Sequence, residues 1–139
     1  MGMDSISVTT RHRNELVDIT SQVAELVSKS GITSGICILY VPHTTAAVTI
    51  NESYDPDVAC DIIATLNRLV PAGAGYQHTE GNADAHIKSV LVGCSVVIPV
   101  ENSRLALGRW QGIFFCEFDG PRQRRCFVQL IGNKLQEEQ

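Results

Sequence analysis

The sequence of 139 residues lacks several features that define common protein classes. No apolar run approaches the roughly 20 residues of a membrane-spanning helix, and the N-terminus has no hydrophobic signal-peptide core. No Walker loop, GxGxxG or GxSxG motif is present, so nucleotide binding by those routes is unsupported. The net charge of −4 argues against the basic field that broad nucleic-acid binding needs. We therefore expect neither a membrane nor a nucleic acid as a partner.

Cysteine is present, but not in a pattern that indicates disulfides. The chain has five cysteines, an odd number, and no CxxC pair. Cys37, Cys94, Cys116 and Cys126 lie in apolar segments, where cysteine behaves as a small hydrophobe, and Cys60 lies in a predicted helix. We predict buried, reduced thiols and hence a cytoplasmic protein.

The hydrophobic pattern predicts a single α+β domain over residues 1–139. Hydrophobic residues make up 44% and charged residues 19%, which is enough apolar sequence for a core, and no repeat or linker interrupts it. The predicted strands are 3–10, 16–19, 35–41, 45–50, 94–100, 105–110, 111–118 and 124–131. The predicted helices run from about 20 to 30, from 56 to 70 and from 83 to 92. Because the later strands are apolar on both faces, either two sheets pack together or one face meets another subunit, and we expect an oligomer.

Residues 76–93, YQHTEGNADAHIKSVLVG, hold the densest group of chemically useful side chains. Asn82 is placed to cap a short helix that has one apolar face, at i, i+4, i+7 and i+8, formed by Ala83, Ile87, Val90 and Leu91. His86 lies in the second turn of that helix, and His78 lies just upstream in a polar loop. Two imidazoles on separate pieces of backbone can converge on one point, which suits a metal or a phosphate.

His43 follows Pro42 at the end of a predicted strand, beside Thr44 and Thr45. It is either a strand-end residue that bonds the backbone or a ligand. His43, His78 and His86 together would supply three neutral imidazoles, a donor set that suits zinc and leaves one position for water or substrate. The sequence thus predicts a divalent metal, with zinc as the candidate, or a phosphate held by the same histidines.

Other polar groups could serve such a site, and each has an ordinary alternative. Glu52 ends an apolar strand as a capping group or a general base. Asp84 and Lys88 are spaced i, i+4, so they form a helix salt bridge or act on a ligand, with Asp84 orienting it and Lys88 meeting a phosphate. The arginines at 122, 124 and 125 are surface residues or a bidentate phosphate clamp, and Trp110 is expected to pack.

Several motifs in order give the chain a family resemblance. They are HTTAAVTINE followed by DPDV, then HxxGNADAHIKSxxxG, then LALGxWQxI, and last ExDGPR. Over about residues 16–132 the chain resembles the YjbQ-like (UPF0047) family. The resemblance implies a β-sandwich core of about seven or eight strands with two to three helices, and assembly as a homotrimer. It also implies a secondary thiamine-phosphate synthase activity and places a metal or anion site at His43, His78 and His86. One departure is Arg109, where the family usually has threonine in GTWQ.

Two functions of different classes follow. The first is a small-molecule enzyme of the transferase type, whose site must neutralise a leaving diphosphate; the histidines would hold the metal or phosphate, and Glu52, Asp84 and Lys88 would be catalytic. The second is a non-catalytic trimer that binds a metal or a small phosphorylated or anionic ligand. A third, purely structural interpretation treats the histidines as buried packing residues.

Overall fold

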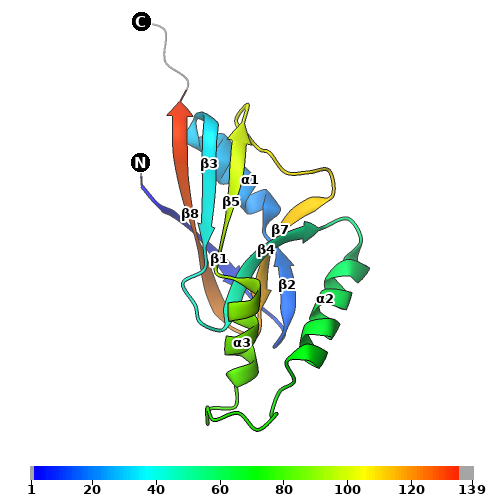
Figure 1. The fold of residues 1–139 in the computed structure, drawn as a ribbon. Coiled ribbons are helices and arrows are strands. Elements are labelled where there is room, and N and C mark those ends of the chain that lie inside the picture. Colours follow the sequence, from blue (N-terminus) through cyan, green and yellow to red (C-terminus); the bar gives the residue numbers. More distant parts are fainter. Residues whose placement is uncertain (1, 135–139) are drawn as a thin grey trace, which may run out of the picture.

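Two antiparallel sheets face each other in the computed structural model, which describes residues 2–134 (Figure 1). The strands of this part are β1 (Asp4–Thr9), β2 (Glu15–Asp18), β3 (Ile32–Tyr40), β4 (Ala46–Glu52), β5 (Ser95–Glu101), β6 (Arg104–Leu105), β7 (Gln111–Glu117) and β8 (Gln123–Lys134). The helices are α1 (Thr20–Ser30), α2 (Pro56–Leu69) and α3 (Ala83–Val92). The predicted α+β sandwich of eight strands and three helices is therefore confirmed.

The larger sheet has the order β1-β8-β3-β5-β6, and the smaller has the order β2-β7-β4. In the larger sheet Cys37 on β3 lies opposite Leu130 on β8 and Ile98 on β5, and all three side chains are buried. Phe115 on β7 and Val48 on β4 are paired in the smaller sheet and belong to the same buried cluster. Alternate residues of both sheets thus form one core, as expected for packed β-sheets.

The pairing of β3 with β8 depends on two facing glycines. Gly35 lies opposite Gly132, and a Cβ atom at Gly35 would lie 2.1 Å from the Ile131 carbonyl oxygen. At Gly132, a Cβ would lie 2.2 Å from the Ser34 carbonyl oxygen. The two backbones approach so closely that neither position has room for a side chain.

Local sequence signals explain how α1 and α2 begin and end. Gly31 closes α1 in the left-handed conformation, with φ of 78°, as its position predicts. Asp55 caps α2, its side chain accepting a hydrogen bond of 2.9 Å from the Asp57 amide, and Pro56 follows at the first turn. Val23 and Val27 fix α1 in the core, whereas no residue of α2 is buried.

The apolar face of α3 is not the face that meets the body. Of its members, Val90 is 83% exposed and Leu91 61% exposed. The buried face instead carries Asp84 and Lys88. Periodicity alone cannot tell an apolar face that meets the core from one that stays exposed, and here the charged pair has its partners on the body.

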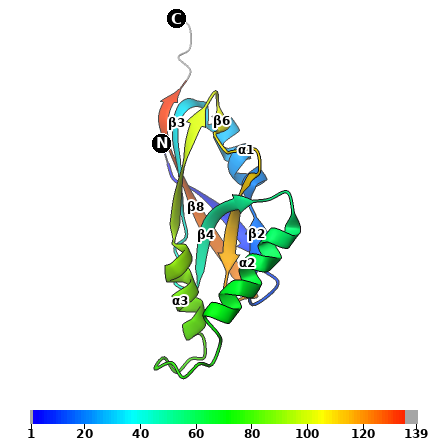
Figure 2. The ribbon, with the colours of Figure 1, turned by 45° about the vertical axis from the view of Figure 1, so that its right-hand side comes forward.

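The loops differ in smaller ways. Of the brief strand or bend expected at 105–110, only Leu105 belongs to a strand, the two-residue β6, and β8 is longer than expected. Figure 2 shows α2 and α3 beside one half of the sandwich, with α1 at the other half. No helix within residues 2–134 is long and apolar enough to cross a membrane.

Candidate functional site

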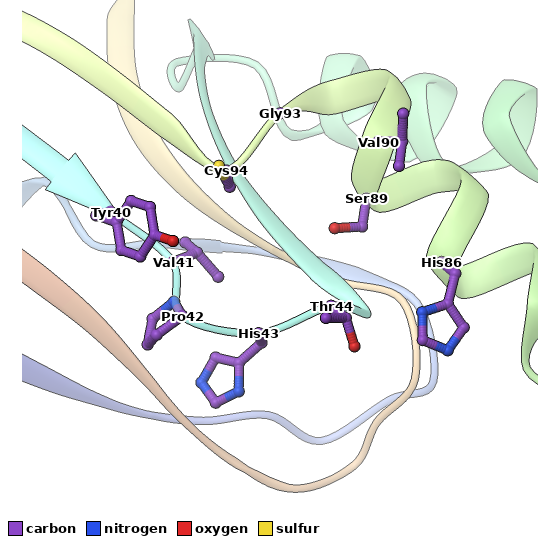
Figure 3. A pocket seen from close by; sticks show the side chains of 10 residues that line it. All are labelled: Tyr40, Val41, Pro42, His43, Thr44, His86, Ser89, Val90, Gly93 and Cys94. Carbon is purple, nitrogen blue, oxygen red and sulfur yellow. The ribbon is translucent and has the colours of Figure 1, made fainter.

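A pocket of about 690 Å³ lies between α3 and the segment that connects β3 to β4 (Figure 3). His43 and His86, two of the three predicted histidines, both line it. The other lining residues are Tyr40, Val41, Pro42, Thr44, Ser89, Val90, Gly93 and Cys94. The fold thus brings together two imidazoles that are distant in the sequence.

His43 is oriented by a hydrogen bond to the backbone. Its Nε2 accepts the amide of Arg125 on β8 at 3.0 Å. Since this bond occupies the lone pair of Nε2, the neutral ring carries its proton on Nδ1. Burial lowers the pKa of His43, the charges of Arg124 and Arg122 lower it further, and Glu117 opposes them only in part. At neutral pH His43 is therefore an uncharged ring with an Nδ1–H donor, and its Nε2 is not free to bind a metal.

A buried ion pair between Arg124 and Glu117 holds the segment that follows His43, through hydrogen bonds from Arg124 to Thr45. Arg124 Nε donates to Glu117 Oε1 at 2.8 Å, and a terminal nitrogen of the same guanidinium donates to the Thr45 hydroxyl at 2.8 Å. The Thr10 hydroxyl, at 2.7 Å, and the Asp119 amide, at 3.0 Å, also donate to the Glu117 carboxylate. Burial would raise the pKa of Glu117, but these hydrogen bonds and the Arg124 charge outweigh it and hold that pKa below its ordinary value.

This pair corrects the interpretation of Arg124. The side chain is buried, and its Nε and one terminal nitrogen are bonded to Glu117 and Thr45, so it is not a surface residue. Arg122 and Arg125 are exposed, in agreement with the surface interpretation. The sequence contained one signal for the pair: Glu117 alternates with the apolar Ile113 and Phe115 on one strand face, and a carboxylate there requires a cation.

His78 meets His86 as predicted, but it does not line the pocket. Their ring centroids are 5.2 Å apart in an edge-to-face arrangement, and His78 Nε2 lies 3.7 Å from the Glu80 carboxylate. Within residues 2–134 no three His, Cys, Asp or Glu side chains come close enough together to hold a metal ion. The residues of one chain therefore do not fit the three-histidine zinc site, because His43 bonds the backbone and His78 lies outside the pocket. The divalent metal stays a prediction.

Asp84 and Lys88 lie on the opposite face of α3 from His86. Lys88 is 1% exposed; its Nζ donates to the side-chain oxygens of Asn14 at 3.0 Å and Asn67 at 2.6 Å and lies 3.8 Å from Asp84. Burial lowers the pKa of Lys88, although the Asp84 carboxylate acts against this shift. Arg13 donates to Asp84 at 3.1 Å. Asp84 and Lys88 thus form the predicted i, i+4 salt bridge. Their contacts also hold α3, and with it His86, against the body of the protein.

Glu52 lies far from the histidines in one chain. It is the last residue of β4, whereas His43 precedes the first residue of that strand. At about 3.3 Å per residue, the two ends of β4 are about 20 Å apart. Glu52 lines a second pocket, with Tyr54 and Trp110.

The fold and the pocket define a class: small two-sheet α+β proteins with a histidine-bearing pocket at the start of the β4 segment. A family model described as "UPF0047 protein YjbQ-like" matches residues 4–133. The chain therefore belongs to the YjbQ (UPF0047) family, as the motifs predicted.

Relatives agree over nearly the whole chain. The UPF0047 protein MJ1081 of Methanocaldococcus jannaschii is 53% identical over 91% of this chain and 92% of its own length. The UPF0047 protein YugU of Bacillus subtilis is 47% identical over 94% of this chain and 99% of its own length. A crystal structure of a yjbq/upf0047 family protein from Clostridium acetobutylicum has a TM-score of 0.90 and 47% identity, covering 92% of this chain and 99% of that one. The hypothetical protein APE1520 of Aeropyrum pernix gives a TM-score of 0.92 at 40% identity, over 96% of this chain and 100% of that chain.

Proposed function

We propose that the pocket between His43 and His86 binds a small phosphorylated or otherwise anionic ligand. The observation that carries the proposal is the bond from the Arg125 amide to His43 Nε2, because it leaves the opposite nitrogen, Nδ1–H, as a hydrogen-bond donor. A donor suits a phosphate oxygen, whereas a metal needs a free lone pair.

The surroundings of His43 favour negative charge. Arg124 and Arg122 lower its pKa, so their positive charge reaches the pocket edge. The Thr44 side chain lines the same pocket and adds a hydroxyl donor, and His86 adds a second imidazole. The Ser89 hydroxyl is occupied, since it donates to the Ala46 carbonyl at 2.6 Å. The polar groups left for a ligand are therefore mainly donors.

We further propose that the pocket serves a small-molecule enzyme with thiamine-phosphate synthase-type side activity. Such a reaction joins an aminopyrimidine diphosphate to a thiazole phosphate and releases pyrophosphate, whose charge the site must stabilise. In this scheme His43 and His86 donate to the leaving diphosphate. Asp84 and Lys88 act as positioning residues for α3. Glu52 acts as a base in this pocket only if another subunit supplies it.

The proposal includes a cytoplasmic homotrimer. Tyr40, Val97 and Ile131 leave an exposed apolar surface on the outer face of the larger sheet, and Val90 and Leu91 do so on α3. A second subunit covering these residues would remove apolar area from water. The cysteines of residues 2–134 are all free thiols, as suits a reducing compartment. Light scattering on the purified protein tests the trimer.

The alternative function is a non-catalytic trimer that binds a metal or an anion as a store or sensor. The same pocket would serve it, without turnover. An assay of pyrophosphate release, with both substrates present, distinguishes the enzyme from the binding protein. An enzyme shows turnover that His43→Ala abolishes, whereas a binding protein shows affinity alone.

The binding proposal is tested by calorimetric titration with pyrophosphate, using metal-free protein. We expect His43→Ala and His86→Ala each to weaken binding about tenfold or more, as the loss of a hydrogen bond to a charged ligand predicts. His12→Ala, which replaces an exposed histidine outside the pocket, should bind like the wild type.

Elemental analysis of the same samples decides between anion and metal. Pyrophosphate binding without metal supports the proposal. Near one divalent ion per chain, lost when His43, His78 and His86 are replaced, would support the zinc prediction instead. Absence of pyrophosphate binding, or binding that His43→Ala leaves unchanged, would overturn the anion pocket.

A further inference from the structure

A second pocket, of about 680 Å³, lies at the far end of β4. Its lining residues are Glu52, Tyr54, Asp55, Pro56 and Trp110. They come from the end of β4, the start of α2 and the segment before β7. A 2.9 Å hydrogen bond from the Ser53 amide to the Trp110 carbonyl joins the segment after β4 to the segment before β7. This pocket is separate from the one between His43 and His86.

Two aromatic rings form the apolar part of this second pocket. Tyr54 is 77% exposed and Trp110 47% exposed, and their rings meet edge to face with centroids 5.1 Å apart. Trp110 is the single tryptophan of the chain and was expected to pack; instead much of its surface faces solvent. Aromatic faces left open in a pocket are a surface for a ligand, because each ring carries a large apolar area and a negative face.

A cation already lies against one of these rings. The Arg109 guanidinium is 4.9 Å from the centre of the Trp110 ring, within the range of a cation–π contact. Arg109 is not among the residues that line the pocket, so it contacts the indole without filling the space. Its positive charge acts against a second cation at this ring, so the attraction for a cationic ligand has to come from the carboxylates of the pocket and the Tyr54 ring.

The charged groups of the lining are both carboxylates. No ion pair in the described part of the chain engages Glu52 or Asp55. Asp55 Oδ1 accepts the Asp57 amide as the helix cap, while no basic side chain lines the pocket. A ligand here meets two aromatic rings and two carboxylates, against the single positive charge of Arg109 beside the indole, and this balance favours a cation over an anion.

We propose that this pocket binds a small organic cation of the quaternary ammonium type. The alkyl groups of such a cation contact the Tyr54 and Trp110 rings, and Glu52 and Asp55 supply the opposite charge. An alkylated ammonium fits better than a metal ion, because it gives up less hydration and makes van der Waals contact with the rings.

Fluorescence of Trp110 tests the proposal directly, since the chain has one tryptophan. Choline chloride is titrated into the full-length protein at constant ionic strength. The uncharged isostere 3,3-dimethylbutan-1-ol is titrated in parallel. We expect a saturable change with choline and at least tenfold weaker binding of the alcohol.

Variants assign the binding to the pocket. Tyr54→Ala and Glu52→Gln should each weaken choline binding about two- to fivefold, as the loss of one exposed cation–π or charge contact predicts. Glu80→Gln removes an exposed carboxylate elsewhere and should bind choline as the wild type does. His43→Ala should also leave choline binding intact, which separates this proposal from the anion pocket.

Three results would overturn the inference. The first is the absence of a saturable fluorescence response to choline in the full-length protein. The second is equal affinity for choline and the alcohol, which would make the pocket merely apolar. The third is choline binding that neither Tyr54→Ala nor Glu52→Gln weakens.

Discussion

The buried pair of Glu117 and Arg124 allows a sharp test of how the His43 segment is held. Glu117→Gln keeps the size of the side chain and removes its charge, so Arg124 stays buried without a counter-ion. Removing one partner of a buried ion pair costs about 3–5 kcal/mol of unfolding free energy. The Thr45 contacts of Arg124 remain, but they are neutral and do not replace the carboxylate.

This cost corresponds to a large shift in melting temperature. At about 2.1 cal/mol/K per residue, the unfolding entropy of the 139-residue chain is about 0.3 kcal/mol/K. The expected drop in Tm at pH 7 is therefore about 10–17 °C. Replacing both partners, in Glu117→Gln/Arg124→Met, should restore part of the loss because no unpaired charge remains buried.

The pH dependence gives a second readout of the same pair. Hydrogen bonds and Arg124 hold the folded-state pKa of Glu117 below its ordinary value of 4.5. The pair thus contributes fully above the unfolded-state pKa, and its contribution is lost as pH falls through the lower folded-state pKa. The Tm difference between wild type and Glu117→Gln should be constant from pH 8 to about 6 and shrink only in acid below the unfolded-state value.

Scanning calorimetry measures these differences, with Glu25→Gln as the matched control. Glu25 pairs with Lys29 at 2.7 Å on the exposed face of α1, and its loss should leave Tm within experimental error. The reasoning is refuted if Glu117→Gln lowers Tm no more than Glu25→Gln does. It is also refuted if the double variant Glu117→Gln/Arg124→Met lowers Tm by as much as the single variants Glu117→Gln and Arg124→Met do when their losses are added.

Three further predictions concern the sheet, the thiols and His43. Gly35→Ala places a Cβ 2.1 Å from the Ile131 carbonyl and should prevent stable folding, whereas Gly2→Ala, with no atom within 4 Å, should fold normally; yield and circular dichroism check both. Thiol titration of the native protein should find Cys60 and Cys94 reactive, because burial raises the pKa of Cys37 and Cys126 to about 11 and that of Cys116 to about 12; fast reaction of a third thiol would contradict the buried positions. Histidine NMR should give His43 a pKa below 6.5, so the wild type should lose stability as pH falls through 6.5 toward that value, and His43→Gln should lessen this loss; a pKa at or above 6.5 would refute the geometry.

The sequence predicted what local chemistry determines. Gly31 ends α1 and Asp55 caps α2 because each needs only its own neighbours along the chain. Because the later strands are apolar on both faces, the sequence predicted that both faces are covered, either by a second sheet or by another subunit, and the structure shows two packed sheets. The motifs predicted the family, and the fold brings His43 and His86 to one pocket.

Long-range contacts set what the sequence did not predict. Lys88 is buried because Asn14 and Asn67, which are remote in sequence, accept its hydrogen bonds. Glu117 on β7 and Arg124 on β8 belong to different sheets, so their ion pair joins the two sheets and became visible only once the packing of the sheets was known. The exposure of the Trp110 ring depends on how the segment before β7 meets the end of β4. The sequence does not show this contact, so the tryptophan was expected to pack.

The exposed apolar residues of α3 carry one further consequence. Ile87, Val90 and Leu91 lie at i, i+3 and i+4 and are exposed, so they form an apolar face that extends over more than one turn of the helix. The opposite face is held to the body by charge and amide contacts of Lys88, which leaves the apolar face directed outward. His86 and Val90 both line the pocket, so that face borders the ligand site. A subunit that covered the α3 face would therefore also close the pocket, which couples the proposed trimer to the proposed anion binding.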